Sequence, residues 1–436
     1  MRLLISFAIM LSILSLPARA AGLIRDPDIE HSLTQLARPV LQAAGLSPNQ
    51  VKILLINDRV PNAFVVDNRA IFIHTGMITR LKSAEALQAV IAHEAAHIAN
   101  GHVARRMVQA GTRRSVTGLG IALAAAAAAS GANSSAAGAL AIGVSSSAQR
   151  SFLRHSRAEE SSADQSAVRY LAASGISTRG AIEVHAIFKD QDALSEARQD
   201  PYARSHPFTR DRVRAMQAYV ASYGGDRPYS SDSAYWFERA KGKLWAFQQA
   251  PKSTLRRAKD MPSADITLMM QAVAQHRRSQ TANAAATMQR LLKARPKDAQ
   301  YHELLGQILL EGRQFNAAVN AYGRAAKLNP NDALILGGYG RALLASGRTK
   351  QAEQTLETAR ARDFRDPSVL RDLGSAYAKN GKPAMASLAV AERYALIGRL
   401  EDAELHAKRA ASRLSTGSGP WQRAQDVLSA AQRHKK

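Results

Sequence analysis

The spacing of hydrophobic positions changes twice in the first half of the chain. A helical spacing over residues 26–45 predicts one helix. It gives way to strand-like apolar runs joined by turn residues, at residues 51–56, 63–66 and 70–73. These runs predict a small sheet. From Ser83 the helical spacing returns and predicts one long helix over about 84–108.

The second half contains an internal repeat. Small residues recur every 34 residues, at Gly306, Gly340 and Gly374 and again at Ala318, Ala352 and Ala386. Pro296 and Pro330 follow the same interval. A period of 34 with small residues at helix crossings is typical of tetratricopeptide helix pairs. We therefore expect a repeat array from about residue 264, with a degenerate first repeat and an imperfect capping pair beyond residue 390.

These patterns predict a mainly α-helical protein with two folded halves. An α+β domain with a small sheet is expected over 21–225, and an all-α tetratricopeptide solenoid over 264–436. Residues 226–263 are expected to form a helical linker, preceded by a Gly/Pro/Ser-rich stretch. The Ala/Gly-rich tract 117–149 leaves open a buried or lid-like hairpin, a shallow membrane-inserting hairpin, or disorder.

The first twenty residues are typical of a secretory signal. Arg2 precedes a largely apolar run, and Pro17 is followed by a small-residue cleavage site at Ala18-Arg19-Ala20. The apolar run is shorter than the roughly 20 residues that span a bilayer. We expect cleavage after Ala20 and export of the mature protein. The chain has no cysteine, which excludes a lipoprotein anchor, disulfides and a thiolate site.

Basic residues exceed acidic residues by 24 in the whole chain, and the excess is uneven. Without the leader, 57 basic and 35 acidic side chains give +22, of which residues 251–436 carry +15. The sequence contains no basic motif interleaved with aromatic residues, and an exported protein is separated from the nucleic acids of the cell. Nucleic-acid binding is therefore not expected. Anionic lipopolysaccharide, acidic assembly partners and peripheral membrane contact remain open as explanations of the charge.

The chemical centre of the sequence is His93-Glu94-Ala95-Ala96-His97, an HExxH motif on a predicted helix. Histidines four apart differ by about 40° around a helix, so both imidazoles can reach one ion. Neutral imidazole suits Zn²⁺, and Glu94 is placed to act as the base for water bound to it. His102, five residues beyond His97, points about 140° away on a continuous helix and is expected to be structural or to support a ligand.

The third ligand is expected to be Glu160. Glu160 and Asp164 share one helix face, so that one can bind Zn²⁺ while the other holds a ligand imidazole by its second nitrogen. Glu159 lacks such a partner, because residue 163 is alanine.

Further candidates lie outside these helices. His206, in Ser205-His206-Pro207, is expected either to stabilise an oxyanion or to occupy the open position of Zn²⁺ in a resting state. Arg212 is expected to fix His206 or to bind a carbonyl oxygen. Residues 62–64 are either an ordinary strand start or a binding edge for an extended substrate. His74 and His185 are expected to be structural.

In the order of these motifs the chain resembles the zinc peptidase family that includes the CAAX prenyl endopeptidases and the HtpX-like proteases. It is similar above all to periplasmic members that enhance β-barrel assembly and end in tetratricopeptide repeats. The resemblance implies a zincin-type metallopeptidase fold for residues 21–225. It further implies that His93, His97 and Glu160 hold one Zn²⁺, that Glu94 is the catalytic base, and that Asp164 supports a ligand from the next layer of side chains. It also implies quality control of unfolded or misassembled outer-membrane proteins.

Two functions are therefore weighed. The first is a periplasmic zinc endopeptidase whose repeats recruit substrates or the outer-membrane barrel assembly machinery. The second is a chaperone-like repeat adaptor with occasional proteolysis, since a helical array offers a concave surface to partners in either case.

Overall fold

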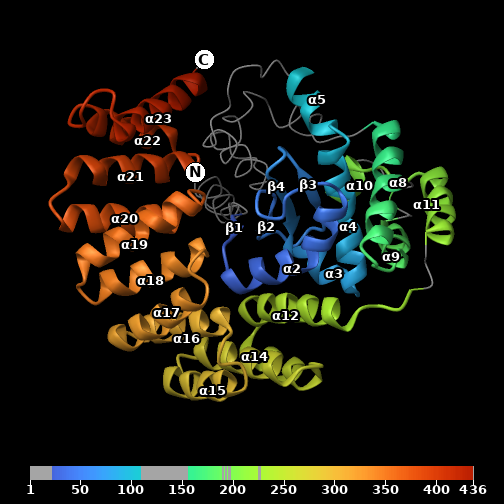
Figure 1. Cartoon of the computed structure of the whole chain (residues 1–436), viewed down its shortest axis with the longest axis horizontal. Helices are drawn as coiled ribbons and strands as arrows, with labels where there is room; N and C mark the ends of the chain where they lie inside the picture. Colours follow the sequence, from blue (N-terminus) through green and yellow to red (C-terminus); the bar gives the residue numbers. More distant parts are fainter. Residues whose placement is uncertain are drawn as a thin grey trace, which may run out of the picture.

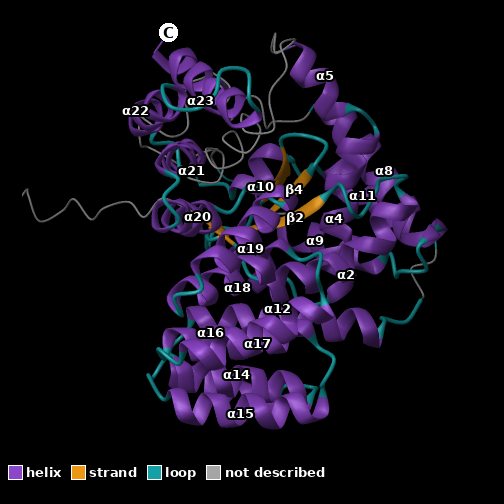
Figure 2. Cartoon of the chain, turned by 60° about the vertical axis from the view of Figure 1, so that its left-hand side comes forward, coloured by secondary structure: helices purple, strands orange, loops and turns teal. Residues whose placement is uncertain are grey.

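A computed structural model describes residues 22–109, 156–188, 191, 194, 198–223 and 227–435. Helices dominate the described chain and enclose one small sheet (Figures 1 and 2). The mainly helical fold, with a small sheet in the first half and an all-helical second half, is confirmed. The predicted leader and the tract 117–149 lie outside the described residues. No helix in the described ranges is long and apolar enough to cross a membrane.

The sheet has four strands in the order β1-β2-β4-β3. Its members are β1 (Leu23–Ile24), β2 (Lys52–Ile56), β3 (Ala63–Val65) and β4 (Ala70–His74). The strands β2 and β4 are parallel, with Ile53 opposite Ile71, whereas β1 and β3 add antiparallel edges. The three predicted strands are present. The two-residue β1 is too short to produce an alternation in the sequence.

Helices surround this sheet in the first half (Figure 1). They are α2 (Pro27–Ala43), α3 (Thr75–Arg80), α4 (Ala84–Ala99), α5 (His102–Gln109), α8 (Arg157–Ala173), α9 (Arg179–Phe188), α10 (Pro201–Ser205) and α11 (Arg210–Ser222). The core lies where α4 packs against α2, α8 and α9. Every residue of α4 from Ala84 to His97 is buried. The candidate ligands on this helix are therefore held by a rigid, fully enclosed element.

The prediction of one helix over 84–108 is wrong. The helix α4 ends at Ala99, Gly101 takes a left-handed backbone with φ of +73°, and α5 begins at His102. Glycine adopts this conformation without a Cβ clash, which is why it commonly ends helices. The break turns His102 back toward α4 instead of leaving it on the far side of a continuing helix.

The second half is a stack of antiparallel helix pairs. The helices are α14 (Ala264–His276), α15 (Thr281–Ala294), α16 (Ala299–Glu311), α17 (Phe315–Leu328), α18 (Ala333–Ala345), α19 (Thr349–Arg362), α20 (Pro367–Lys379), α21 (Pro383–Leu396), α22 (Leu400–Ala411) and α23 (Gly419–Lys435). Gly306 shows why the repeat keeps a small residue, since a Cβ there would lie 2.6 Å from the Tyr322 ring of the paired helix.

The segment expected to be a linker is helical and packs against both halves. It comprises α12 (Ser231–Gln248), α13 (Pro251–Arg257) and the short 3₁₀ helix η2 (Ala258–Asp260). Phe237 and Leu244 of α12 belong to the core of the first half, whereas Ala246 belongs to that of the first repeat. The helix α12 thus joins the two halves as a shared core element and does not act as a spacer.

A buried charge cluster lies at this junction. Arg239 of α12, 1% exposed, donates to Asp28 of α2 at 2.6 Å and to both carboxylate oxygens of Asp298, which precedes α16, at 2.6 and 2.9 Å. Its guanidinium also lies 3.9 Å from the centre of the Tyr301 ring. One arginine therefore ties the sheet-bearing half to the repeats through groups that water does not reach.

We predict that Arg239→Met lowers the free energy of unfolding by about 3–5 kcal/mol, because it leaves the buried Asp28 without its closest cation. Urea unfolding followed by circular dichroism measures the change. Adding Asp28→Asn to Arg239→Met should recover part of the loss. A double variant as unstable as the single one would show that Arg239 acts through packing and not through charge.

Candidate metal centre

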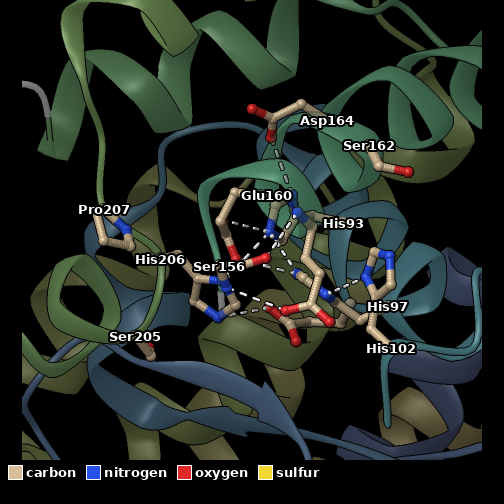
Figure 3. Close-up of polar contacts among 12 residues, drawn as sticks. His93, His97, His102, Ser156, Glu160, Ser162, Asp164, Ser205, His206 and Pro207 are labelled. Carbon is tan, nitrogen blue, oxygen red and sulfur yellow. Dashed lines mark hydrogen bonds and ion pairs between the residues drawn. The ribbon is translucent and has the colours of Figure 1, made fainter. Parts of the chain in front are cut away.

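Four buried side chains from three separate segments converge on one point: His93 and His97 of α4, Glu160 of α8, and His206 directly after α10 (Figure 3). One donor atom of each lies within 4.8 Å of those of the others. The Nε2 atoms of the two α4 histidines are 3.1 Å apart, and that of His93 is 3.3 Å from Nδ1 of His206. Carboxylate oxygens of Glu160 lie 3.4 Å from each α4 Nε2 and 2.9 Å from the His206 nitrogen.

These spacings fit a tetrahedral ion. Four nitrogen and oxygen ligands at about 2.0–2.1 Å from a tetrahedral Zn²⁺ have edges of about 3.3–3.4 Å. The measured separations, between 2.9 and 3.4 Å, bracket that edge. The convergence of these ring nitrogens makes the cluster a candidate metal site. The prediction that the HExxH histidines meet Glu160 agrees with the geometry, and His206 joins them as a fourth potential ligand.

Both α4 imidazoles are oriented by their second nitrogen. His93 Nδ1 lies 3.1 Å from Asp164 Oδ1, and His97 Nδ1 lies 2.9 Å from His102 Nδ1. A hydrogen bond at Nδ1 leaves the Nε2 lone pair directed at the ion, which is the usual arrangement of metal-binding histidines. The expectation that His102 supports a ligand therefore agrees with its position, and the break at Gly101 supplies the physical reason.

The first turn of α8 separates Glu159 from Glu160. Glu159 closes a capping box, in which its carboxylate accepts from the Ser156 backbone and its own backbone N–H donates to the Ser156 hydroxyl. This places Glu159 at the surface side of the helix. Glu160, the next residue, is fully buried and points into the cluster. Glu159 therefore caps α8, whereas Glu160 lies among the candidate metal ligands.

Arg212 of α11 lies behind the carboxylates. Its Nε and Nη2 each donate to Asp164 at 2.8 Å, and Nη1 lies 2.8 Å from Glu160 and donates to the Pro207 carbonyl at 2.6 Å. The guanidinium thereby fixes the two α8 carboxylates and the backbone next to His206. Of the two roles expected for Arg212, its contacts favour the positioning one.

The charges of the cluster favour a bound cation. Burial alone would raise the pKa of Glu160, but His206 and Arg212 hold it well below its usual range. Burial alone would lower the pKa of His93, but Glu160 and Asp164 raise it to about 10. For His97 burial dominates, and its pKa falls well below the usual value, so that this imidazole is neutral. Two carboxylates that stay ionised in a buried pocket attract a positive charge, either a proton or a metal ion.

Glu94 is the one carboxylate of the group whose pKa is raised. Burial is the main cause, and His206 and His93 offset part of it. Neither of its oxygens accepts a hydrogen bond from the described residues, and Oε1 lies 3.5 Å from His206 Nε2. A carboxyl with a raised pKa and free oxygens beside an ion site has the properties of a general base.

Sequence reasoning missed one contact of the site. His185 of α9, expected to be structural, is buried with its Nε2 3.9 Å from Asp164 Oδ1 and its ring against Phe208. No local sequence signal marks it, because only the packing of α9 beside α4 and α8 brings it there. His74 lies at the end of β4 with Nδ1 3.0 Å from the Val60 carbonyl, which agrees with the structural role expected for it.

Comparison with known proteins agrees with this geometry. Residues 25–220 match the model of peptidase family M48, and residues 269–333 and 309–373 match tetratricopeptide repeat models. The chain carries a peptidase family M48 domain followed by tetratricopeptide repeats. The chain is therefore a metallopeptidase, as the HExxH motif predicted, with the M48 domain over residues 25–220.

One relative matches this chain over most of its own length, and another over a short segment. The beta-barrel assembly-enhancing protease of Escherichia coli K12 is 25% identical over 406 residues, which cover 92% of this chain and 82% of that protein. The mitochondrial metalloendopeptidase OMA1 of Schizosaccharomyces pombe is 29% identical over 75 residues, 17% of this chain and 22% of that one. Among solved structures, MamA of Desulfovibrio magneticus RS-1 covers 36% of this chain and 92% of its own, with 17% identity and a TM-score of 0.32.

We predict that Glu160→Gln weakens metal binding far more than Glu159→Gln, because only the former replaces an oxygen directed at the ion. Asp164→Asn should weaken it by about 10–100-fold, the usual effect of losing a group that orients a ligand. Competition with a chelator of known affinity measures all three. The reverse order of the two glutamates would place the third ligand one residue earlier in α8.

Proposed function

We propose that this chain is a periplasmic zinc endopeptidase that acts in the quality control and assembly of outer-membrane proteins, with repeats that recruit substrates or the assembly machinery. Export rests on the signal-like first twenty residues. The observation that carries the proposal is the near-tetrahedral group of buried histidine and glutamate donors beside the free carboxylate of Glu94. His₂Glu is a known ligand set of catalytic zinc sites in peptidases.

The residues supply the parts of a peptide hydrolysis. A bound Zn²⁺ lowers the pKa of a coordinated water and polarises a peptide carbonyl. Glu94 accepts the proton of the attacking water and delivers it to the leaving amine, for which its raised pKa is suitable. Asp164 and His102 keep the two ligand imidazoles in the tautomer that presents Nε2. Arg212 keeps both α8 carboxylates in place through the cycle.

His206 supports a closed resting state. A catalytic zinc site needs one open position, whereas the His206 Nδ1 lies at the fourth corner, 2.9 Å from Glu160 and 3.3 Å from His93. The imidazole must move before a substrate carbonyl can take its place. Of the two roles expected for His206, this position favours occupation of the open metal position in a resting state. A closed centre cleaves rarely, so the same position also supports the alternative function as a chaperone-like adaptor.

The sheet offers a place for the substrate. The strand β3 forms the edge of the sheet and packs against α4, the helix that carries the HExxH motif. All three residues of β3 are buried, so an extended substrate chain would add backbone hydrogen bonds to this edge only once it is uncovered. An unfolded outer-membrane protein supplies such chains, which fits the substrate class given by the name of the Escherichia coli relative.

The decisive experiment compares the purified protein with Glu94→Gln on casein and on an unfolded porin, with zinc content measured for both. We predict one zinc per chain in each protein and a loss of cleavage of about 10²–10⁴-fold in the variant, the usual contribution of a general base. Glu159→Gln serves as a control that keeps both zinc and cleavage. Undiminished cleavage by Glu94→Gln would refute the peptidase mechanism, and loss of its zinc would make Glu94 a ligand.

A further inference from the structure

In the repeat array several acidic side chains are buried, whereas the basic ones are not. Seven acids of this half are buried: Asp265, Glu303, Glu353, Asp363, Asp372, Glu392 and Glu404. None of the arginines and lysines between residues 264 and 432 is buried. The surface of the array is therefore more positive than its sequence charge alone indicates.

The array has two edges with different surroundings. Its helices alternate in direction, so turns within a pair lie at one edge and turns between pairs at the other. The between-pair edge faces the peptidase half, where Asp298 pairs with Arg239 and Asp363 pairs with Arg25 at 2.7 Å. The within-pair turns of α18–α19 and α20–α21 lie on the outer side of the stack, away from that half (Figure 1).

This outer edge is basic in four successive pairs. Its exposed cations, which we name the basic ridge, are Arg278, Arg313, Arg348, Lys350, Lys379 and Lys382. The four turns and the first helical turn after each contain two acids, Glu311 and Glu353. Both are engaged within the chain, Glu311 by His276 and Gln307 and Glu353 by Asn380 and Lys382. Lys382 is therefore paired within the chain, whereas no ion pair with a described residue involves the other five cations of the ridge.

The ridge has no apolar anchor. The exposed large hydrophobic side chains of the described residues are Val60, Leu194, Tyr223, Tyr229, Ile397 and Leu405, and none lies in these turns. Protein partners are usually held by buried aromatic or aliphatic anchors. An attraction through charge alone is typical of a lipid headgroup surface, where each lysine or arginine strengthens binding about fivefold.

The spacing of the turns also favours a surface over a compact ligand. The first helices of successive pairs contact each other, α16 with α18 and α18 with α20. Packed helices lie about 8–10 Å apart, so the four within-pair turns extend over about 30 Å along the array. We propose that the basic ridge docks this protein on the surface of an anionic phospholipid bilayer. The Arg239 junction then holds the peptidase half on the side of the array that faces away from the lipid.

The test uses sedimentation of the purified protein with vesicles of phosphatidylcholine containing about 30% phosphatidylglycerol, and with phosphatidylcholine alone. The ridge variant is Arg278→Glu, Lys350→Glu and Lys379→Glu. Arg313 is left unchanged, because its backbone has a positive φ of 61° and a substitution would confound charge with strain. The control variant is Arg290→Glu, Lys293→Glu and Lys327→Glu, which changes the charge of three exposed side chains by the same amount. These residues lie on α15 and α17, and Lys293 and Lys327 are in the last turns of these helices, toward the between-pair edge.

The protein should bind the anionic vesicles at low salt and not the neutral ones. The ridge variant should bind at least about 100-fold more weakly, and the control within about threefold of the unchanged protein. Binding should fall as the salt concentration rises from about 0.05 to 0.3 M, because screening shortens the reach of each charge. Casein cleavage by both variants should equal that of the unchanged protein, which separates this test from that of the peptidase function.

Several results would overturn the proposal. An equal loss in both variants would mean that net charge and not the ridge governs binding. Equal sedimentation with neutral vesicles would exclude headgroup charge as the cause. Failure of the unchanged protein to bind anionic vesicles at low salt would exclude a lipid surface. It would favour an acidic protein as the partner of the basic ridge.

Discussion

The centre depends on two carboxylates one turn apart on a single helix. Asp164 and Glu160 of α8 stay ionised in a buried pocket because Arg212 donates to one and pairs with the other. Through His93 and His206 these carboxylates fix two imidazoles from elements more than 110 residues apart in sequence. Burial alone would raise the pKa of both acids, and Arg212 offsets this effect at both of them, together with His206 at Glu160 and with His185 and His93 at Asp164.

The same principle, a buried arginine between two acids, joins the halves. Arg239 links Asp28 and Asp298, as Arg212 links Glu160 and Asp164. Such clusters contribute little net stability but tolerate few alternative arrangements, so they fix geometry. In this chain one cluster fixes the ligands and the other fixes the array relative to the peptidase half. Substrates gathered by the repeats would therefore meet the centre in a defined orientation.

Sequence reasoning succeeded where periodicity or fixed spacing carries the information. The 34-residue interval predicted the array. The i, i+4 relations predicted that His93 and His97 lie on one face of their helix, and that Glu160 and Asp164 lie on one face of theirs. For His206 the sequence left two roles open, an oxyanion stabiliser and an occupant of the open metal position, because only the packing of α11 against α8 brings this residue beside Glu160. The Asn100-Gly101 pair was a readable helix-stop signal that would have shortened the long helix and explained His102. No local sequence pattern indicates the Arg239 junction or the buried acids of the array.

X-ray absorption at the zinc edge of the purified protein tests the central claim most directly. Four buried donors around one ion predict a first shell of four nitrogen and oxygen atoms at about 2.0–2.1 Å, with outer-shell scattering from three imidazoles. Replacing His206 by alanine should remove one imidazole and admit an oxygen ligand without loss of the ion. A first shell with fewer than two imidazoles, or zinc in substoichiometric amounts, would contradict the account.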